Sequence, residues 1–383
     1  MSASPLAAAR VLRFPAAMTA QLTPLAATLP STVPFVGPET QERALGRPFR
    51  ARLGANESLF GPSPRAIAAM AQAAGDVWMY GDPELHELKA ALAAHHGCRP
   101  ENIVVGEGID GLLGYLTRLM IAPGDRVVTS FGAYPTFTFH VAGYGGEIMR
   151  VPYQGDHEDP EALIAAAEQH LPKLVYIANP DNPMGSHHPA EVLERMVDAL
   201  PPDTLLILDE AYIDLAPPGT APSIAADDPR VIRFRTFSKG YGMAGLRVGY
   251  AICAPDLARA FDKIRNHFGM GRIAQAGALA ALADQEWLAT VQSRVARGRD
   301  RLGAIARDNG AVPLPSATNF VTMDLGRDGE FARATLRALT DLGVFVRMPG
   351  VAPLDRCLRV SVGDDAALDI FAEALPLALK AAR

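Results

Sequence analysis

From residue 61 onward, short apolar runs alternate with longer segments in which apolar side chains recur at helical spacing. Short apolar runs between turn residues are typical of buried strands, and the longer segments are typical of amphipathic helices. We expect strands at residues 103–105, 126–129, 147–151, 174–178, 205–208, 231–234 and 248–252, and helices at 64–74, 84–95, 110–120, 136–142, 160–169, 189–199 and 255–267. This alternation predicts an α/β fold with a mostly parallel sheet sandwiched by helices.

The pattern changes after residue 271, where strands become fewer and helices longer. We expect helices at 272–309, at 330–342 and from 364 onward, and strands at 319–323, 344–347 and 357–362. Few strands with separate helices indicate a smaller α+β domain. The expected organisation is therefore an N-terminal arm (1–45), a large domain (46–271) and a small C-terminal domain (272–383), joined by part of the N-terminal segment.

The composition excludes several classes of function. A net charge of −6 and a pI near 5.9 favour neither nucleic acid nor an anionic membrane as a partner. No apolar stretch approaches the roughly 20 residues that span a bilayer. The three cysteines are far apart and form no CxxC pair, which indicates a reducing, cytoplasmic compartment. The first 38 residues carry no acidic residue, and we expect a loosely ordered arm, with a transit peptide as the alternative.

Lysine is scarce in this chain, since only five of the 36 basic residues are lysine. Four of them lie in helical patterns, before a strand or in the C-terminal tail, and are expected to be solvated. Lys239 instead lies between the apolar strand 231–234 and a glycine-rich turn. A primary amine there can form a Schiff base with a carbonyl compound, which arginine cannot do because it stays protonated.

Three further motifs follow expected strands, at the edge where open α/β sheets place their ligands. Residues 106–111 (Gly-Glu-Gly-Ile-Asp-Gly) open a helix whose free N–H groups suit a phosphate, although the letters also fit a dinucleotide-binding pattern. Residues 179–185 (Asn-Pro-Asp-Asn-Pro-Met-Gly) could be a plain turn. Asp209 could be a helix cap, a metal ligand or a partner for a protonated ring nitrogen. Because the histidines at 95–96 and 187–188 form adjacent pairs unsuited to one site, we expect no metal.

Taken together, these groups match the needs of pyridoxal phosphate. The cofactor requires an amine for its aldehyde, a carboxylate for its pyridine nitrogen, donors for its phenolic oxygen, an aromatic face and a phosphate cup. The matching residues occur in this order: 108–110, an aromatic residue near 134–137, Asn182, Asp209, Tyr212, Ser238, Lys239 and Arg247. The complete set is far more specific than any of its members.

With these motifs the chain resembles the fold-type I aminotransferases, and most closely their histidinol-phosphate aminotransferase branch. The resemblance spans residues 34–363 and is strongest at 53–57, 179–185, 208–212, 236–247 and 357–363. It implies a transaminase that moves an amino group from histidinol phosphate, or from an aromatic or other L-amino acid, to a 2-oxo acid such as 2-oxoglutarate. The alternative is a pyridoxal-phosphate lyase similar to threonine-phosphate decarboxylase.

The resemblance also implies roles for individual residues. Lys239 would hold the cofactor as the internal aldimine and move a proton during the reaction, while Asp209 would keep the pyridine nitrogen protonated. Asn182 and Tyr212 would hydrogen-bond the phenolic oxygen. The phosphate would be held by Ser238, Arg247, the helix start at Gly108, Ile109 and Asp110, and Tyr80 of the partner subunit. The shared tyrosine implies a homodimer with two shared active sites.

The aromatic residue that stacks on the cofactor ring is expected from its place between two strands. Counting from the flanking strands favours Phe137, with Tyr134 as the second choice. In the 179–185 motif, Met184 stands where the family usually has threonine, a departure that should leave the cofactor contacts intact.

Four residues are expected at the substrate end of the site. Arg359 would clamp the acidic group of the substrate, because a guanidinium fork fits a carboxylate and also serves a phosphate. Arg347 could provide a second anion contact, with a surface ion pair as the alternative, and Asn56 would line the same pocket. Phe35 stands where histidinol-phosphate enzymes often have a phosphate-binding tyrosine, which leaves the substrate open.

Overall fold

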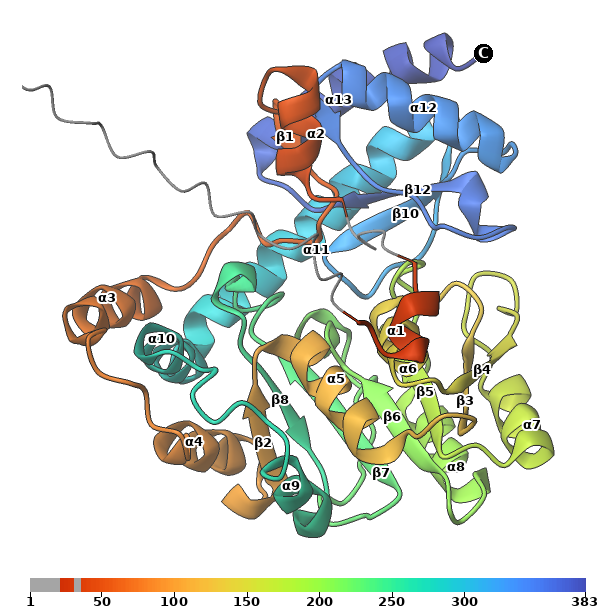
Figure 1. Ribbon diagram of the computed structural model, residues 1–383. Helices are drawn as coiled ribbons and strands as arrows, with labels where there is room; N and C mark the ends of the chain where they lie inside the picture. Colours follow the sequence, from red (N-terminus) through yellow and green to blue (C-terminus); the bar gives the residue numbers. More distant parts are fainter. Residues whose placement is uncertain (1–20, 31–35) are drawn as a thin grey trace, which may run out of the picture.

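The computed structural model describes residues 21–30 and 36–383 and has a seven-stranded sheet at its centre (Figure 1). The strand order is β2-β8-β7-β6-β5-β3-β4. The strands are β2 (Ile103–Gly106), β3 (Arg126–Ser130), β4 (Glu147–Val151), β5 (Leu174–Ala178), β6 (Leu205–Asp209), β7 (Val231–Thr236) and β8 (Gly249–Ile252). Only β8 is antiparallel to its neighbours β2 and β7, and the other pairs are parallel. The expected mostly parallel sheet is confirmed.

Strand β5 shows why helices cover both faces of this sheet. Its side chains alternate in direction, so that Leu174 and Tyr176 pack on one face while Val175 and Ile177 pack on the other. The first face is covered by α5 (Gly108–Met120), α6 (Thr136–Gly143) and α9 (Pro255–Phe261), and the second by α7 (Pro160–His170) and α8 (Ala190–Ala199). A strand that is apolar at every position therefore needs a helical layer on each side.

A third group of helices covers the β2 end of the sheet. These helices are α3 (Pro64–Ala73), α4 (His86–His96) and α10 (Arg272–Ala283). Their apolar side chains form one cluster with Ile103 and Val105 of β2 and Tyr250 and Ile252 of β8. The edge strand β2 is thus packed beneath helices that come from both halves of the sequence.

The C-terminal part forms a separate antiparallel sheet of β9 (Val312–Pro313), β10 (Phe320–Asp324) and β12 (Cys357–Ser361). Three helices pack around it: α11 (Gln285–Asp308), α12 (Gly329–Asp341) and α13 (Asp365–Ala381). A short strand from the start of the chain, β1 (Ala51–Arg52), pairs in parallel with β11 (Val344–Phe345). Leu53 is buried in the same apolar cluster, so the N-terminal segment is packed into the C-terminal core.

The remaining elements are short. Helices α1 (Pro24–Thr28) and α2 (Pro38–Leu45) precede β1, and single 3₁₀ turns lie at Ala74–Asp76, Pro100–Asn102, Ile213–Leu215, Ala244–Leu246 and Leu354–Arg356. In the described part of the chain, none of the helices combines the length and apolar character needed to cross a bilayer.

Two expected helices differ from the structure. The helix expected at 255–267 ends at Phe261, and Arg265 beyond it donates a hydrogen bond to the carbonyl of Pro83 at 2.8 Å. The single helix expected at 272–309 is two helices that meet at Asp284. Its carboxylate accepts a hydrogen bond from the backbone N–H of Trp287, because an acidic N-cap satisfies a donor that a new helix leaves free.

Candidate active site

A cavity of about 580 Å³ lies at the carboxyl ends of β5, β6 and β7. The last residues of these strands, Ala178, Asp209 and Thr236, form part of its wall. Of the residues expected in the site, the cavity is lined by Asn56, Ile109, Asp110, Tyr134, Asn182, Asp209, Tyr212, Ser238, Lys239, Arg247, Arg347 and Arg359. Parallel strands bring these distant positions together because their carboxyl ends meet at one edge of the sheet.

Lys239 lies in the connection between β7 and β8 and extends into the cavity. Its Nζ donates a hydrogen bond to the backbone carbonyl of Asn56 at 3.0 Å and lies 5.6 Å from the ring centre of Tyr212. Burial, followed by the positive charge of Arg359, lowers the pKa of Lys239 to about 8. The neutral amine, which can act as a nucleophile or base, is therefore much more abundant near neutral pH than for a lysine with an ordinary pKa.

Asp209 forms the floor of the cavity at the end of β6. One carboxylate oxygen accepts a hydrogen bond from the hydroxyl of Tyr176 at 2.7 Å, and the other accepts one from the N–H of Ala211 at 2.9 Å. Burial raises the pKa of Asp209 to about 6, against the effect of these two hydrogen bonds. Such a carboxylate would gain from a cationic partner in the cavity, because a buried negative charge is costly until it is paired.

Tyr212 and Asn182 provide polar groups on the walls above Asp209. The phenol oxygen of Tyr212 accepts a hydrogen bond from Asn56 Nδ2 at 2.9 Å, and burial raises the Tyr212 pKa. Asn56 adopts a left-handed backbone conformation (φ 55°), which asparagine tolerates better than most residues. Asn182 Oδ1 accepts a hydrogen bond from Arg359. Both amides thus come from loops and face the same space.

One end of the cavity is built for an anion. Arg247 Nη1 lies 3.4 Å from Ser238 Oγ, and both residues face the first turn of α5 at Ile109 and Asp110. The N–H groups of a helix's first turn are free to bind an anion. Gly108 has a positive φ of 79°, and a Cβ there would lie 2.3 Å from the guanidinium of Arg247. Glycine at this position lets the arginine reach the helix end.

Two further arginines line the cavity. Arg359 donates to the carbonyl of Gly54 at 2.9 Å and lies over the ring of Phe320, while its Nε has no hydrogen-bond partner among the described residues. Arg347 donates to the carbonyl of Val36 at 2.6 Å. Neither arginine forms an ion pair with a described residue. Because these two guanidinium groups have no carboxylate partner among the described residues, this part of the cavity is suited to an anionic ligand.

Three of the expected site residues that the structure describes, Phe137, Gly108 and Tyr80, do not line the cavity. Phe137 is 1% exposed and stacks on Tyr176 at 5.0 Å between ring centres, so of the two aromatic candidates for the cofactor ring only Tyr134 lines the cavity. The reason is that Phe137 lies in the first turn of α6 and points into the core. Gly108 contacts the guanidinium of Arg247, which itself lines the cavity. Tyr80 is 77% exposed on the surface, and Phe35 lies outside the described residues.

The comparisons with known proteins agree with this arrangement. The family described as aminotransferase class I and II matches residues 51–375. This chain belongs to that family. It is 34% identical to the histidinol-phosphate aminotransferase of Moorella thermoacetica over 88% of this chain and 87% of that protein. It is 36% identical to the aromatic amino acid aminotransferase of Mycobacterium avium over 89% of this chain and 97% of that protein.

A solved structure is similar to this aminotransferase over nearly its full length. It is the histidinol-phosphate aminotransferase of Sinorhizobium meliloti in complex with pyridoxal-5'-phosphate. The two chains are 55% identical, the similarity covers 94% of this chain and 98% of that one, and the TM-score is 0.92.

The donor set of this aminotransferase fits pyridoxal phosphate. The cavity offers a carboxylate at Asp209, the last residue of β6, and an anion cup at Ser238 and Arg247 and an amine at Lys239, which all lie in the connection between β7 and β8. At the anion cup, β8 passes close to the first turn of α5, since a Cβ on Gly249 would lie 2.7 Å from the backbone of Gly108 and Ile109. Each chemical group of the cofactor thus has a matching group in the wall.

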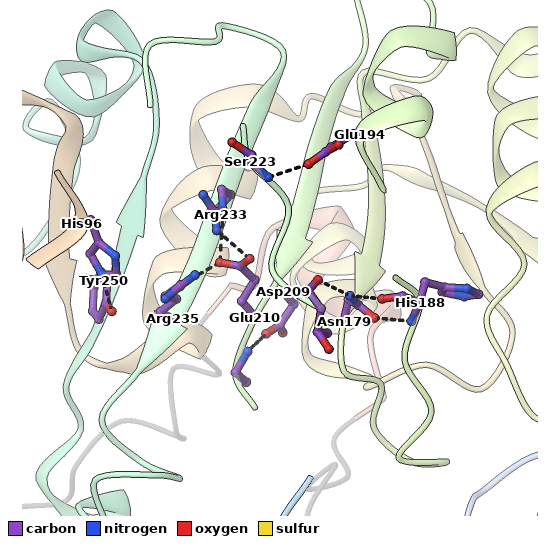
Figure 2. Close-up of polar contacts among 12 residues, drawn as sticks. His96, Asn179, His188, Glu194, Asp209, Glu210, Ser223, Arg233, Arg235 and Tyr250 are labelled. Carbon is purple, nitrogen blue, oxygen red and sulfur yellow. Dashed lines mark hydrogen bonds and ion pairs between the residues drawn. The ribbon is translucent and has the colours of Figure 1, made fainter. Parts of the chain in front are cut away.

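The sequence reasoning missed residues that support the site from behind. Tyr176, one strand away from Asp209, holds its carboxylate, and a hydroxyl near the end of an otherwise apolar strand was the available signal. Asn179 exchanges hydrogen bonds with the backbone of His188 (Figure 2), which closes the loop that presents Asn182. This pairing joins positions nine residues apart, and no local pattern indicates it.

Proposed function

We propose that this chain transfers the amino group of histidinol phosphate to a 2-oxo acid such as 2-oxoglutarate, with pyridoxal phosphate bound at Lys239. The observation that carries the proposal is the 55% identity over 94% of the chain with a histidinol-phosphate aminotransferase in complex with this cofactor. Arg347 and Arg359 support it, because they line the same cavity as the anion cup and form no ion pair with a described residue.

When bound, pyridoxal phosphate supplies an aldehyde that condenses with amines and a ring that takes up electrons from the adjoining carbon. Lys239, with a pKa lowered to about 8, would move the proton at the substrate carbon, because a base with a pKa near the working pH does so efficiently. Asp209 would hold a proton on the pyridine nitrogen, and that ion pair would stabilise its buried carboxylate. Tyr134 would lie against the ring.

The remaining cofactor contacts would be polar. Asn182 and Tyr212 would bind the phenolic oxygen from one side of the ring. Ser238, Arg247 and the N-terminal turn of α5 would hold the phosphate by charge and hydrogen bonding.

Arg359 and Arg347 would bind the acidic group of each substrate in turn. The amino donor carries a phosphate and the 2-oxo acid a carboxylate, and a guanidinium fork can accept two oxygens of either. The unpartnered Nε of Arg359 is available for this purpose. A single anion site would then serve both half-reactions.

The protein would act as a homodimer in the cytoplasm. The exposed Tyr80 packs on Phe268, whose ring centre is 4.8 Å away, and would complete the phosphate site of the other subunit. We also propose the division into an arm (1–45), a large domain (46–271) and a small domain (272–383) that is joined by part of the N-terminal segment. Its support is that residues 272–383 contribute the second sheet and that β1 pairs with β11.

An aromatic amino acid is the second candidate donor, because one relative at 36% identity is an aromatic amino acid aminotransferase. Phe35, in place of a phosphate-binding tyrosine, would be consistent with it. The family match favours neither this donor nor the other, but it speaks against the lyase alternative.

Single-turnover titrations of the purified, cofactor-loaded protein would separate these donors. Each donor is added alone and the visible absorbance of the cofactor is followed, after which 2-oxoglutarate is added. Histidinol phosphate should bleach the absorbance at least about 100-fold more efficiently than phenylalanine, since its phosphate engages the arginines. The reverse preference would assign the aromatic function, and carbon dioxide release without an oxo product would assign a lyase.

A further inference from the structure

A buried chain of hydrogen bonds connects the second sheet to Tyr212. Ser361, the last residue of β12, is 1% exposed, and its Oγ accepts a hydrogen bond from the backbone N–H of Asn56 at 3.0 Å. The same Oγ lies 3.0 Å from Asn56 Oδ1, and Asn56 Nδ2 lies 2.9 Å from the phenol oxygen of Tyr212. The chain therefore joins a strand end, an N-terminal loop and the cavity wall.

The donors and acceptors in this chain have a single consistent order. A backbone N–H can only donate, so Ser361 Oγ is an acceptor toward Asn56 N, and its own proton is left for Asn56 Oδ1. The amide oxygen then faces Ser361 and the NH₂ group faces Tyr212. Since an amide NH₂ can only donate, the phenol oxygen must accept, and its proton points elsewhere.

A reversed Asn56 amide would break this order. Its NH₂ group would then donate to Ser361 Oγ, which would accept twice and keep a buried proton for which no described residue provides an acceptor. Buried polar hydrogens without partners are strongly disfavoured. The hydroxyl of Ser361 therefore determines which way the Asn56 amide faces.

We propose that Ser361 and Asn56 are positioning residues that direct the phenol proton of Tyr212 into the cavity, toward the phenolic oxygen of the bound cofactor. No described residue accepts a hydrogen bond from Tyr212, so that proton is available to a ligand. This inference rests on the proposed function, because the cofactor supplies the acceptor.

The arrangement connects the two ends of the site. Ser361 and Arg359 are two residues apart on β12 and therefore point to the same side of the strand. The backbone carbonyl of Asn56 also accepts a hydrogen bond from Lys239 Nζ at 3.0 Å. One loop residue thus contacts the reactive lysine, orders the phenol proton and bonds to the strand that carries the substrate-binding arginine.

A matched pair of variants at Ser361 tests this inference in the cofactor-loaded protein. Ser361→Thr and Ser361→Val have nearly the same shape and differ in the hydroxyl, so packing effects are common to both. The readout is the pH midpoint at which the visible absorbance of the bound cofactor changes. We expect Ser361→Val to raise this midpoint by about one pH unit relative to Ser361→Thr, since a lost hydrogen bond to the phenolate favours proton uptake beside it.

The results that would overturn this inference differ from the result that would overturn the proposed function. In a Tyr212→Phe background the two Ser361 variants should have the same midpoint, because residue 212 then has no hydroxyl proton that Asn56 and Ser361 could direct. Equal midpoints in the Tyr212 background, or a difference that persists with Phe at 212, would overturn the inference. A protein that gains no visible absorbance with pyridoxal phosphate would overturn the proposed function instead. If neither β-branched variant folds, Ser361→Ala and the unmodified protein replace them.

Discussion

Asp209 and Glu210 are consecutive in sequence, yet they belong to two differently built regions. Asp209 lines the cavity, where its carboxylate accepts hydrogen bonds from Tyr176 and the Ala211 N–H and forms no ion pair with a described residue. Glu210 lies behind it, where Arg233 donates to its carboxylate at 2.9 Å and Arg235 at 2.7 Å (Figure 2). We call these regions the cavity floor and the ion-pair cluster of Glu210, Arg233 and Arg235.

The pKa values move in opposite directions in the two regions. Burial raises the pKa of Asp209 to about 6, whereas Arg235 and Arg233 hold the pKa of Glu210 below its ordinary range in spite of burial. In the cluster the chain itself supplies the opposite charge, so the acid is structural. On the cavity floor no described residue supplies a positive charge that pairs with Asp209, so a ligand could supply it. Of these two neighbouring carboxylates, only Asp209 lines the cavity.

The largest effect is expected at Lys239, the reactive group above the floor. Lys239→Ala should lower kcat by at least about 10⁴-fold, because both the attachment of the cofactor and the proton transfer depend on this amine. Lys263→Ala, at an exposed lysine, is the control and should be fully active. The measurement is steady-state kinetics, and near-normal turnover of Lys239→Ala would contradict the assignment.

Asp209→Asn should lower kcat by about 10³-fold, since a neutral amide cannot hold the proton of the cofactor's pyridine nitrogen. Without cofactor, the variant should lose no thermal stability near neutral pH, because the amide removes an unpaired buried charge and can still hydrogen-bond to Tyr176 and Ala211. Kinetics and thermal unfolding of the same preparation check both parts. An equal loss of stability and activity would place Asp209 with the structural acids.

Glu210→Gln should give the converse result. Removing this charge leaves Arg233 and Arg235 buried without compensation, which costs about 3–5 kcal/mol of unfolding free energy. The kcat of the folded fraction should change less than about 5-fold, because no part of Glu210 lines the cavity. Urea unfolding and active-site-normalised kinetics separate the two effects, and a catalytic defect without destabilisation would refute the contrast.

The arginines offer a smaller version of the comparison. Arg359→Lys should lower kcat/KM by about 100-fold, mainly through KM, because lysine keeps the charge and loses the fork. Arg356 lies three residues earlier and is ion-paired with Asp156 and Asp324 outside the cavity. Arg356→Lys should therefore leave kcat/KM within about 3-fold, and equal kinetic losses at both positions would argue against a substrate role for Arg359.

The smallest effect is the pH dependence of stability in the cofactor-free protein. The pKa of Asp209 is raised from 3.8 to about 6, so its contribution is full below pH 3.8 and is lost as the pH rises through 6. The difference in unfolding free energy between wild type and Asp209→Asn should fall by about 2 kcal/mol over this window. For Glu210 the sign is opposite, because its lowered pKa stabilises the fold above 4.5 and that contribution fades at lower pH. Denaturant titrations at several pH values measure both slopes.

The sequence was most informative where structure depends on local patterns. The strands expected at 147–151 and 174–178 have the same bounds in the structure, because apolar runs between turn residues are short-range signals. It was less informative about direction within a turn. Tyr134 and Phe137 are three residues apart, and only the start of α6 at Thr136 turns one toward the cavity and the other into the core.

By itself, the sequence determined the α/β class, the family and the set of chemical groups at the strand ends, because apolar periodicity and short motifs are local. Only the tertiary structure decided which charges are paired. It also decided that Asn56 meets Ser361 across 305 residues, and that burial brings the pKa of Lys239 to about 8. Burial, charge pairing and the order of protons depend on contacts between distant segments, which exist only once the chain has folded.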